Sequence, residues 1–366
     1  MKGSLREILT AEPVATSAPC RIDMGGTLDL AVFYNPLRHL VPCTFNLAID
    51  LRTTVQLLPH RPGRVKISSR GFESADFPSD AAPFDHPLGL MFATAAFFKA
   101  DGVKVLIESS SPPRSALGGS SAAAVALAGA FLIAMDRVAL TPANRRRIAL
   151  LAHRIEESVA GVPCGRQDQL AAAMGGANAW FWRPGWRGFE LERKPLFKKA
   201  YYPVLNRHLL LAYCGVPHES SDVNGRWVRQ FLGGGYRRHW SDIVRLTKKF
   251  IDALTGCNYI EAAEAMNRET ALRLEMTPDV LDDMGTRLAA AAVRCGCGAR
   301  FTGAGGGGCL WALGRAEDIR RLGPVWQEVL SERPEARLLP FGIDRRGLAA
   351  VVGDPGTARR RAQGPD

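Results

Sequence analysis

Apolar residues along the chain alternate with polar ones in two periods, which predict a series of strands and helices. Runs rich in β-branched or alternating apolar residues predict strands at Phe45–Leu58, Val65–Ser68, Val103–Glu108, His208–Cys214, Cys309–Leu313 and Gly347–Val352. Apolar residues at spacings of three and four predict helices at Pro87–Ala100, Ser121–Met135, Asn144–Val159, Trp227–Leu254, Tyr259–Leu274 and Asp279–Arg294. This mixture indicates an α+β protein.

The domain organisation follows from the length and from one break in the pattern. A chain of 366 residues favours two domains. Residues 1–18 lack clear periodicity and are expected to form an arm or a short capping helix, and a turn-rich stretch around Trp182–Gly188 interrupts the middle of the chain. We therefore expect a boundary between about 185 and 205, with one domain over 1–195 and another over 196–366.

Composition narrows the class of protein. Apolar residues make up 46% and charged residues 23% of the chain, as in ordinary globular proteins. No apolar run is long enough to span a bilayer, since the Ala-rich stretch Ala122–Met135 is too short, and the N-terminus lacks a signal pattern. The eight cysteines include no CxxC pair, so reduced thiols are expected rather than disulfides or a zinc site. These features favour a cytoplasmic protein without a membrane partner.

The net charge of +11 allows two interpretations. It favours anionic partners such as nucleotides or sugar phosphates, or it reflects an arginine-rich composition with solvated charges, and we weight the second more. The short runs at 145–147 and 359–361 have no interleaved aromatic residues, so nucleic acid is not an expected partner.

A Gly- and Ser-containing segment at 112–124 lies between a predicted strand and a predicted helix, and reads Pro-Pro-Arg-Ser-Ala-Leu-Gly-Gly-Ser-Ser-Ala-Ala-Ala. Glycines before a helix leave N–H groups uncovered, and these groups and the positive helix end favour a polyphosphate. The serine hydroxyls could cap the helix or bind Mg²⁺. The alternative is a simple glycine-rich turn with a serine cap, and the Gly-Lys-Ser/Thr ending of a Walker A loop is absent.

Acidic residues at the end of the helix over 144–159 form a second candidate. Glu156 and Glu157 precede a Gly- and Pro-containing loop that carries Asp168. Phosphoryl transfer needs a cation to neutralise charge and a group that positions the attacking hydroxyl, and one glutamate with Asp168 could supply both. A solvated helix face is the alternative for the glutamates, and helix capping is the alternative for Asp168.

Two more glycine segments flank the middle of the chain. Arg21 precedes the turn Gly25-Gly26-Thr27-Leu28-Asp29, which by itself suggests a strand followed by a surface turn. The run 303–308 reads Gly-Ala-Gly-Gly-Gly-Gly between apolar patterns. Such a run costs backbone entropy on folding, which favours close approach to a ligand or another loop over a flexible hairpin tip.

Together, these segments resemble the three motifs of the GHMP kinase family, in the family's order, from about Ala18 to Trp311. The first resembles A-P-x-R followed by the G-G-G-T-D turn of fucokinase-like and heptose-7-phosphate kinase-like members. The second resembles P-x-x-x-G-L-G-S-S-A, with Ala116 in place of a glycine and Gly119 in place of the first serine. The third resembles K-x-T-G-A-G-G-G-G-C, with Arg300 replacing the lysine.

The acidic loop is similar to the family pattern E-x-x-x-G-x-x-x-G-x-x-D-Q. This match implies that Glu157 binds Mg²⁺ and that Asp168 is the catalytic aspartate, with Arg21 beside it. A cation there would keep Asp168 ionised and stabilise the transferring phosphoryl group.

The resemblance also implies the remaining site residues. The ATP phosphates would be bound by Pro113, Leu117, Gly118, Gly119, Ser120, Ser121 and Ala122. Mg²⁺ would be bound by Ser120, with Ser121 as a substitute, and by Glu157. A sugar would be bound by Gly25, Gly26, Thr27, Asp29, Asp168, His218, Ser220, Gly305 and Gly306. For the two residues of the 216–224 segment, helix capping with a surface histidine is an equal alternative.

The family implies a ribosomal-protein-S5-like N-terminal domain, a ferredoxin-like C-terminal domain and ATP between them. It further implies an ATP- and Mg²⁺-dependent kinase acting on a hydroxyl of a heptose 7-phosphate- or fucose-like sugar, and a homodimer is compatible with it. Two other functions stay open: a mevalonate-type isoprenoid kinase or decarboxylase, and a non-catalytic sensor of sugar and nucleotide. Asp29 in its turn favours a sugar, and the combination of Arg21, Glu157 and Asp168 favours catalysis.

Overall fold

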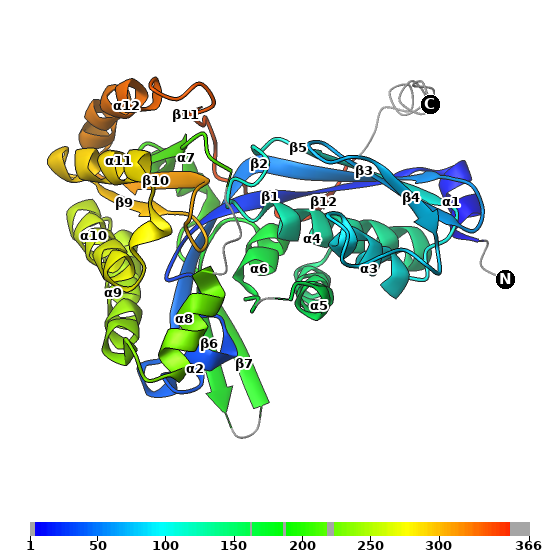
Figure 1. The fold of residues 1–366 in the computed structure, drawn as a ribbon, viewed down its shortest axis with the longest axis horizontal. Helices are drawn as coiled ribbons and strands as arrows, with labels where there is room; N and C mark the ends of the chain where they lie inside the picture. The colour runs from blue at the N-terminus through cyan, green and yellow to red at the C-terminus, as the bar shows by residue number, and fades with distance from the viewer. Residues whose placement is uncertain (1–3, 162, 186–187, 218–222, 352–366) are drawn as a thin grey trace.

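Two antiparallel-rich sheets and the helices that cover them form the computed structural model, which describes residues 4–161, 163–185, 188–217 and 223–351 (Figure 1). The first sheet contains β1 (Val14–Met24), β2 (Cys43–Pro59), β3 (Arg64–Ser69), β4 (Ala75–Pro78), β5 (Val103–Ser109), β6 (Ala177–Gly185), β7 (Gly188–Pro195) and β12 (Ala349–Ala350). The second contains β8 (Leu209–Tyr213), β9 (Gly298–Phe301), β10 (Cys309–Leu313) and β11 (Arg337–Leu338). The α+β class is thus confirmed.

The order of the first sheet is β12-β1-β2-β5-β3-β4, and β6 pairs with the other part of β2 and with β7. All of these pairs are antiparallel except β3 with β5. Strand β2 is long enough to pair with both β5 and β6, so it connects the two ends of the sheet. The C-terminal strand β12 returns to β1, pairing Ala350 with Thr16.

One face of the first sheet is covered by helices (Figure 1). The helices of this half are α1 (Leu5–Ala11), α2 (Ala31–Tyr34), the 3₁₀ helix η1 (Arg38–Leu40), α3 (Gly89–Phe97), α4 (Gly119–Asp136), α5 (Pro142–Val159) and α6 (Gln167–Met174). Alanine is an intrinsically strong helix former, which explains α4. Thr141 caps α5 by accepting a hydrogen bond from the backbone N–H of Asn144, with Pro142 at the first helical position.

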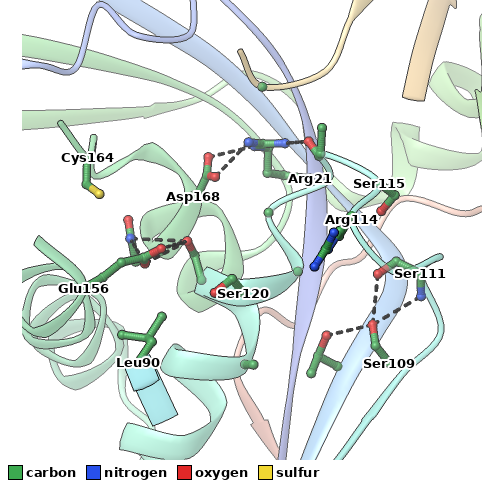
Figure 2. Close-up of a pocket in the computed structure, with 18 of the residues that line it drawn as sticks. Arg21, Leu90, Ser109, Ser111, Arg114, Ser115, Ser120, Glu156, Cys164 and Asp168 are labelled. Carbon is green, nitrogen blue, oxygen red and sulfur yellow. Dashed lines mark hydrogen bonds and ion pairs between the residues drawn. The ribbon is translucent and has the colours of Figure 1, made fainter. Parts of the chain in front are cut away.

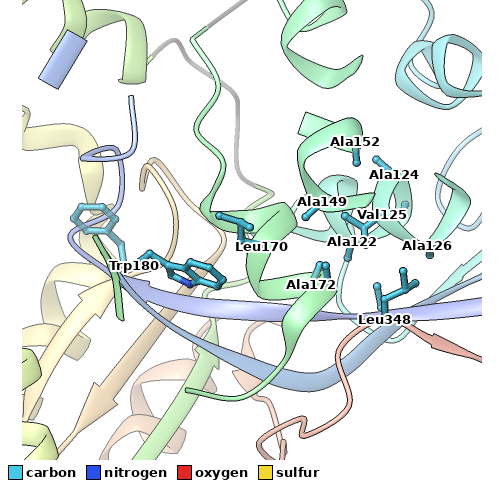
Figure 3. Close-up of a cluster of buried hydrophobic side chains, with 14 of the residues drawn as sticks. Ala122, Ala124, Val125, Ala126, Ala149, Ala152, Leu170, Ala172, Trp180 and Leu348 are labelled. Carbon is cyan, nitrogen blue, oxygen red and sulfur yellow. The ribbon is translucent and has the colours of Figure 1, made fainter. Parts of the chain in front are cut away.

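Small side chains let these helices approach one another closely (Figure 3). Ala122 and Ala126 of α4 and Ala149 and Ala152 of α5 are fully buried in one hydrophobic cluster. Leu348, from the returning C-terminal segment, packs on α4 opposite Gly129, where an added Cβ would lie 2.9 Å from a Leu348 methyl carbon. Helix α4 is long and apolar enough to cross a membrane by length and composition, but most of it is buried, as in a core helix of a soluble protein.

The second sheet has the order β11-β8-β10-β9 and is entirely antiparallel. Its part of the chain also contains η2 (Lys199–Tyr201), α7 (Tyr202–Asn206), α8 (Val223–Leu232), α9 (Arg237–Thr255), α10 (Tyr259–Met276), η3 (Pro278–Val280), α11 (Asp283–Arg294) and α12 (Ala316–Leu330). Buried residues from β1 and β2 join those of α9, α10 and β10 in a second hydrophobic cluster. The two sheets therefore meet across shared apolar contacts, and the division at 195/196 stays a prediction.

Several elements differ from the sequence-based expectations. The single helix expected over Trp227–Leu254 is two helices, because Gly233–Gly235 separates α8 from α9 and Gly234 adopts φ +89°. The segment expected to be an arm or a short capping helix contains the short helix α1 and the start of β1, and the described part of the turn-rich stretch belongs to β6 and to the start of β7. Helix α12 had no prediction, and the last expected strand is reduced to the two residues of β12.

Candidate active site

A cavity of about 450 Å³ opens where β1, the start of α4 and the last glycine segment meet. Its size lies within the usual range for small-molecule sites. Figure 2 shows Arg21 of β1 and Ser120 at the start of α4 around it, and Gly303 and Ala304 of the glycine segment also line it. Polar residues such as Arg21, Thr27 and Asp29 line it together with apolar ones such as Phe72, Leu90 and Met91.

Arg21 and Asp168 form a bidentate ion pair at the centre of the cavity (Figure 2). Arg21 donates from Nε to Oδ1 of Asp168 at 2.8 Å and from Nη2 to Oδ2 at 2.7 Å. Arg21 is buried on β1, whereas the Asp168 side chain in the first turn of α6 is 24% exposed and faces the cavity. Burial acts to lower the pKa of Arg21, but the carboxylate of Asp168 outweighs it and raises this pKa. The guanidinium therefore stays charged. This geometry fixes the orientation of the Asp168 carboxylate at the cavity wall.

The loop before α4 is tied to the same pair. The backbone N–H of Arg21 donates to the carbonyl of Leu117 at 2.9 Å, and Nη1 of Arg21 donates to the carbonyl of Ala116 at 2.6 Å. Gly118 has φ +74°, and a Cβ there would lie 3.3 Å from Oδ2 of Asp168. The uncovered start of α4 and the Asp168 carboxylate therefore face the same space.

The last glycine segment packs directly on this loop. An added Cβ at Gly308, which has φ +83°, would lie 2.6 Å from the carbonyl oxygen of Ser115. An added Cβ at Gly303 would lie 3.3 Å from the carbonyl oxygen of Ala116. Close contact between two loops thus explains why glycine is needed at these positions.

Glu156, not Glu157, faces the cavity. Glu156 is half-buried at the end of α5 and accepts hydrogen bonds from Ser121 Oγ at 2.9 Å and from Gln169 Nε2 at 2.7 Å (Figure 2). Burial raises the pKa of Glu156 to about 6, although these two hydrogen bonds act in the opposite direction. Glu157 is exposed and does not line the cavity. The structure therefore does not bring the glutamate chosen by motif spacing to this site.

Asp29 is a second buried acid of the cavity, and no cation from the described part of the chain pairs with it. It is 3% exposed and accepts a hydrogen bond from the backbone N–H of Gln167 at 2.9 Å. Burial is the main cause that raises the pKa of Asp29 to about 6, and the charge of Asp168 adds to it. A Cβ at Gly165 would lie 1.8 Å from a carboxylate oxygen of Asp29, so only glycine fits there.

A network of buried charges continues from the cavity into the second half of the chain. Asp23 accepts hydrogen bonds from the backbone N–H of Gly303 at 2.8 Å and from Arg300 at 3.2 Å. Arg300 donates to Glu269 at 2.8 Å, and Arg273 donates to the other oxygen of Glu269 at 2.9 Å. Apart from Gly303, these side chains are all fully buried.

The far end of this network supports the Gly25–Gly26 turn. Arg273 donates to the carbonyl of Gly26 at 2.7 Å. Its guanidinium lies 4.5 Å from the ring centre of Trp227 and 4.6 Å from that of Trp240. Cation–π contacts at these distances help to hold a buried guanidinium. The network therefore joins α10 to both glycine segments at the cavity.

The predicted site residues fall into three groups. Those that line the cavity are Arg21, Thr27, Asp29, Pro113, Gly118, Gly119, Ser120, Ser121 and Asp168. Those that do not are Gly25, Gly26, Leu117, Ala122, Glu157, Gly305 and Gly306. His218 and Ser220 lie outside the described residues.

Packing explains the second group. An added Cβ at Gly25 would lie 2.5 Å from the hydroxyl of Thr247, and one at Gly305 would lie 2.7 Å from the carbonyl oxygen of Val280. Both glycines thus permit close packing within the protein, whereas Gly303 and Ala304 line the cavity.

Several cavity residues had no sequence prediction. Asn224 lies 3.4 Å from the Thr27 hydroxyl, and a hydroxyl cluster of Thr53, Ser109 and Ser111 lines the wall below the loop (Figure 2). Glu156 could have been found, because it follows the buried residues Ala149 and Ala152 by seven and four positions on α5. No pattern in the sequence distinguishes the hydroxyl cluster from ordinary strand residues.

Comparison with known proteins gives one family match and several relatives. Residues 89–176, from the start of α3 to the end of α6, match the model of the GHMP kinases N terminal domain. The mevalonate kinase of Pyrococcus abyssi is 26% identical over 332 residues, which cover 82% of this chain and 88% of the relative.

Two solved structures resemble the whole chain. The galactokinase of Lactococcus lactis in complex with galactose has a TM-score of 0.70 at 18% identity and covers 95% of this chain and 98% of its own. A D-glycero-D-manno-heptose 1-phosphate kinase from Bacteroides thetaiotaomicron also has a TM-score of 0.70, at 17% identity, over 93% of this chain and 99% of its own. At these identities the likeness shows a shared fold.

Proposed function

We propose that this chain, whose residues 89–176 match the GHMP kinases N terminal domain, transfers the γ-phosphoryl group of ATP to a hydroxyl of a sugar or sugar phosphate. The observation that carries this proposal is the Arg21–Asp168 pair facing the start of α4. Phosphoryl transfer depends on positioning the reacting groups, and a fixed carboxylate beside a helix N-terminus that binds phosphates provides this positioning.

The chemistry assigned to the chain's own residues is direct transfer. The N–H groups from Gly118 to Ser121 and the positive end of α4 bind the ATP phosphates. Asp168 orients the substrate hydroxyl and accepts its proton while the oxygen forms a bond to the γ-phosphorus and the bond to the β-phosphate oxygen breaks. Arg21 keeps Asp168 ionised and stabilises charge on the transferring group.

A magnesium site fits the oxygen groups beside α4. Glu156 offers a carboxylate, and the Ser120 and Ser121 hydroxyls lie at the same wall of the cavity. Mg²⁺ prefers such hard oxygen ligands and is commonly held by one or two carboxylates together with substrate phosphates. The described residues contain no cluster of three acidic, histidine or cysteine ligands, which agrees with a site completed by the nucleotide. When bound, Mg²⁺ would neutralise charge on the phosphates, and we assign its carboxylate ligand to Glu156 in place of Glu157.

A sugar suits the polar side chains of the cavity. Asp29, Thr27 and Asn224 present a carboxylate, a hydroxyl and an amide within this region, which are groups that hydrogen-bond to sugar hydroxyls. A heptose 7-phosphate- or fucose-like substrate is therefore our first choice. A mevalonate-type substrate is the second, because the Pyrococcus relative over 82% of the chain is a mevalonate kinase.

ADP release across a panel of sugars, sugar phosphates and mevalonate tests the function. We expect turnover with a sugar or sugar phosphate. Turnover with mevalonate alone would establish the second candidate. No turnover, but clear thermal stabilisation by a sugar, would favour a non-catalytic sensor.

Asp168→Asn tests the catalytic assignment. We expect kcat to fall by roughly 10²–10⁴-fold, the usual contribution of a general base. The variant keeps the volume of the side chain, so Mg-ATP affinity should stay close to that of the wild type. Near-normal turnover would exclude Asp168 as the catalytic base.

A further inference from the structure

Arg114 holds an unfavourable backbone conformation at the edge of the cavity. Its φ is +51°, in the left-handed region, and Ala116 in the same loop has φ +59°. For an L-residue other than glycine, this region is sterically unfavourable. Arg114 is exposed and lines the cavity (Figure 2). A glycine would adopt this backbone conformation without steric strain, so an arginine at this position needs an explanation.

Contacts within the protein do not explain why this residue is an arginine. Among the described residues, the side chain of Arg114 forms no hydrogen bond or ion pair. Arg21, by contrast, is bound to Asp168. The cavity also holds two acids without a cation partner, Asp29 and Glu156. A nucleotide polyphosphate would therefore add negative charge to a wall on which Arg21 is already neutralised.

We propose that Arg114 binds the phosphate groups of the nucleotide and supplies the cation that the phosphate loop otherwise lacks. This inference rests on the proposed function. A guanidinium can donate two parallel hydrogen bonds to phosphate oxygens and carries its charge at every physiological pH. Arg114 belongs to the loop that leads into α4, so its side chain and the N–H groups of Gly118–Ser121 serve one anion.

Arg70 is the other cavity arginine without a partner among the described residues, but its position differs. It follows β3, in a turn that packs against the start of the loop, since an added Cβ at Gly71 would lie 3.1 Å from Cγ of Pro113. Arg114 instead precedes α4 within the loop itself. We therefore assign the phosphate contact to Arg114 and expect a smaller effect from Arg70.

Arg137→Gly offers a matched control for Arg114→Gly. Arg137 is also an exposed arginine in the left-handed region, with φ +52°, but it caps the opposite end of α4 and does not line the cavity. Both substitutions remove one positive charge and one unfavourable conformation. Both should therefore raise the melting temperature, and only the first should affect nucleotide binding.

Calorimetric titration of the full-length protein with Mg-ATP, Mg-ADP, AMP and adenosine tests the inference. We expect Arg114→Gly to weaken Mg-ATP binding by roughly tenfold to a hundredfold, the range for hydrogen bonds to charged groups, with no change for adenosine. Arg114→Lys should lie between the wild type and the glycine variant. Arg137→Gly should bind all four ligands as the wild type does.

Four results would contradict either the inference or the proposed function. Equal Mg-ATP affinity in the wild type and Arg114→Gly would overturn the inference, as would an equal loss for adenosine, which would place Arg114 at the base rather than the phosphates. If Arg114→Gly does not fold, unchanged Mg-ATP affinity in Arg114→Lys and in Arg114→Gln would overturn it. A wild-type protein that does not bind Mg-ATP would contradict the proposed function itself.

Discussion

Glu269 and Asp29 are both buried acids, yet their surroundings change their pKa in opposite directions. Glu269 is fully buried between Arg273 and Arg300. Burial acts to raise its pKa, but the two guanidinium groups outweigh this and lower it. Asp29 accepts from backbone N–H groups such as that of Gln167, and burial raises its pKa to about 6.

This difference in surroundings distinguishes a charged group with a structural role from one that is available to a ligand. In the network around Glu269, positive and negative groups alternate and each carboxylate is matched, so the charges hold the two halves of the molecule together. In the cavity, burial disfavours the charged forms of Asp29 and Glu156, and no cation among the described residues pairs with them. Unmatched acids in a cleft are typical of groups that await a substrate or a metal.

Glu269→Gln should produce the largest change in stability. The substitution keeps the side-chain volume but leaves Arg273 and Arg300 buried without their carboxylate. Breaking a buried pair in this way costs about 3–5 kcal/mol. Urea unfolding followed by circular dichroism measures it.

Glu332→Gln provides the comparison for this experiment. Glu332 pairs with Arg287 on the surface, where both side chains are about half exposed. Its unfolding midpoint should match that of the wild type, because solvent screens such pairs. Equal midpoints for Glu269→Gln and the wild type would contradict a structural role for the network.

Asp29→Asn should make the protein less sensitive to pH. In the folded apo-protein the pKa of Asp29 is raised from 3.8 to about 6, so between these values the folded state holds a proton that the unfolded state has lost. Its contribution to the free energy of unfolding therefore falls as the pH rises, by about 2 kcal/mol from pH 4 to pH 7. The asparagine variant lacks this term.

Unfolding free energies at several pH values check this prediction. The difference between Asp29→Asn and the wild type should grow in favour of asparagine as the pH rises through 6. A constant difference across the pH range would mean that, in solution, Asp29 is either exposed or paired with a cation.

Glu156→Gln and Glu157→Gln should separate the two glutamates by their effect on the metal requirement. We expect Glu156→Gln to raise the Mg²⁺ concentration needed for half-maximal turnover by roughly tenfold to a hundredfold, as for other groups that support a metal site. Glu157→Gln should leave it unchanged, because this side chain is exposed. The reverse result would return the role to Glu157.

Much of the fold could be predicted because its periodic signals are local. The helices α4, α5 and α10 and the strands β2, β5 and β10 lie close to their expected positions. The break between α8 and α9 was marked by Gly233–Gly235, yet the apolar period on both sides concealed it. The β6–β7 hairpin and β11 depend on pairing with distant strands, which no local pattern records.

The sequence by itself determined the α+β class and the three glycine segments, while the family resemblance implied the pairing of Arg21 with Asp168. Those features depend on residue type and spacing along the chain. Only the tertiary structure decided that Glu156 rather than Glu157 faces the cavity, because neighbouring helical residues point in different directions and α5 has one packed face. It likewise decided that Glu269 and Arg273, an ordinary helical pair by spacing, are buried against β9 and the glycine turn, since burial depends on contacts between distant segments.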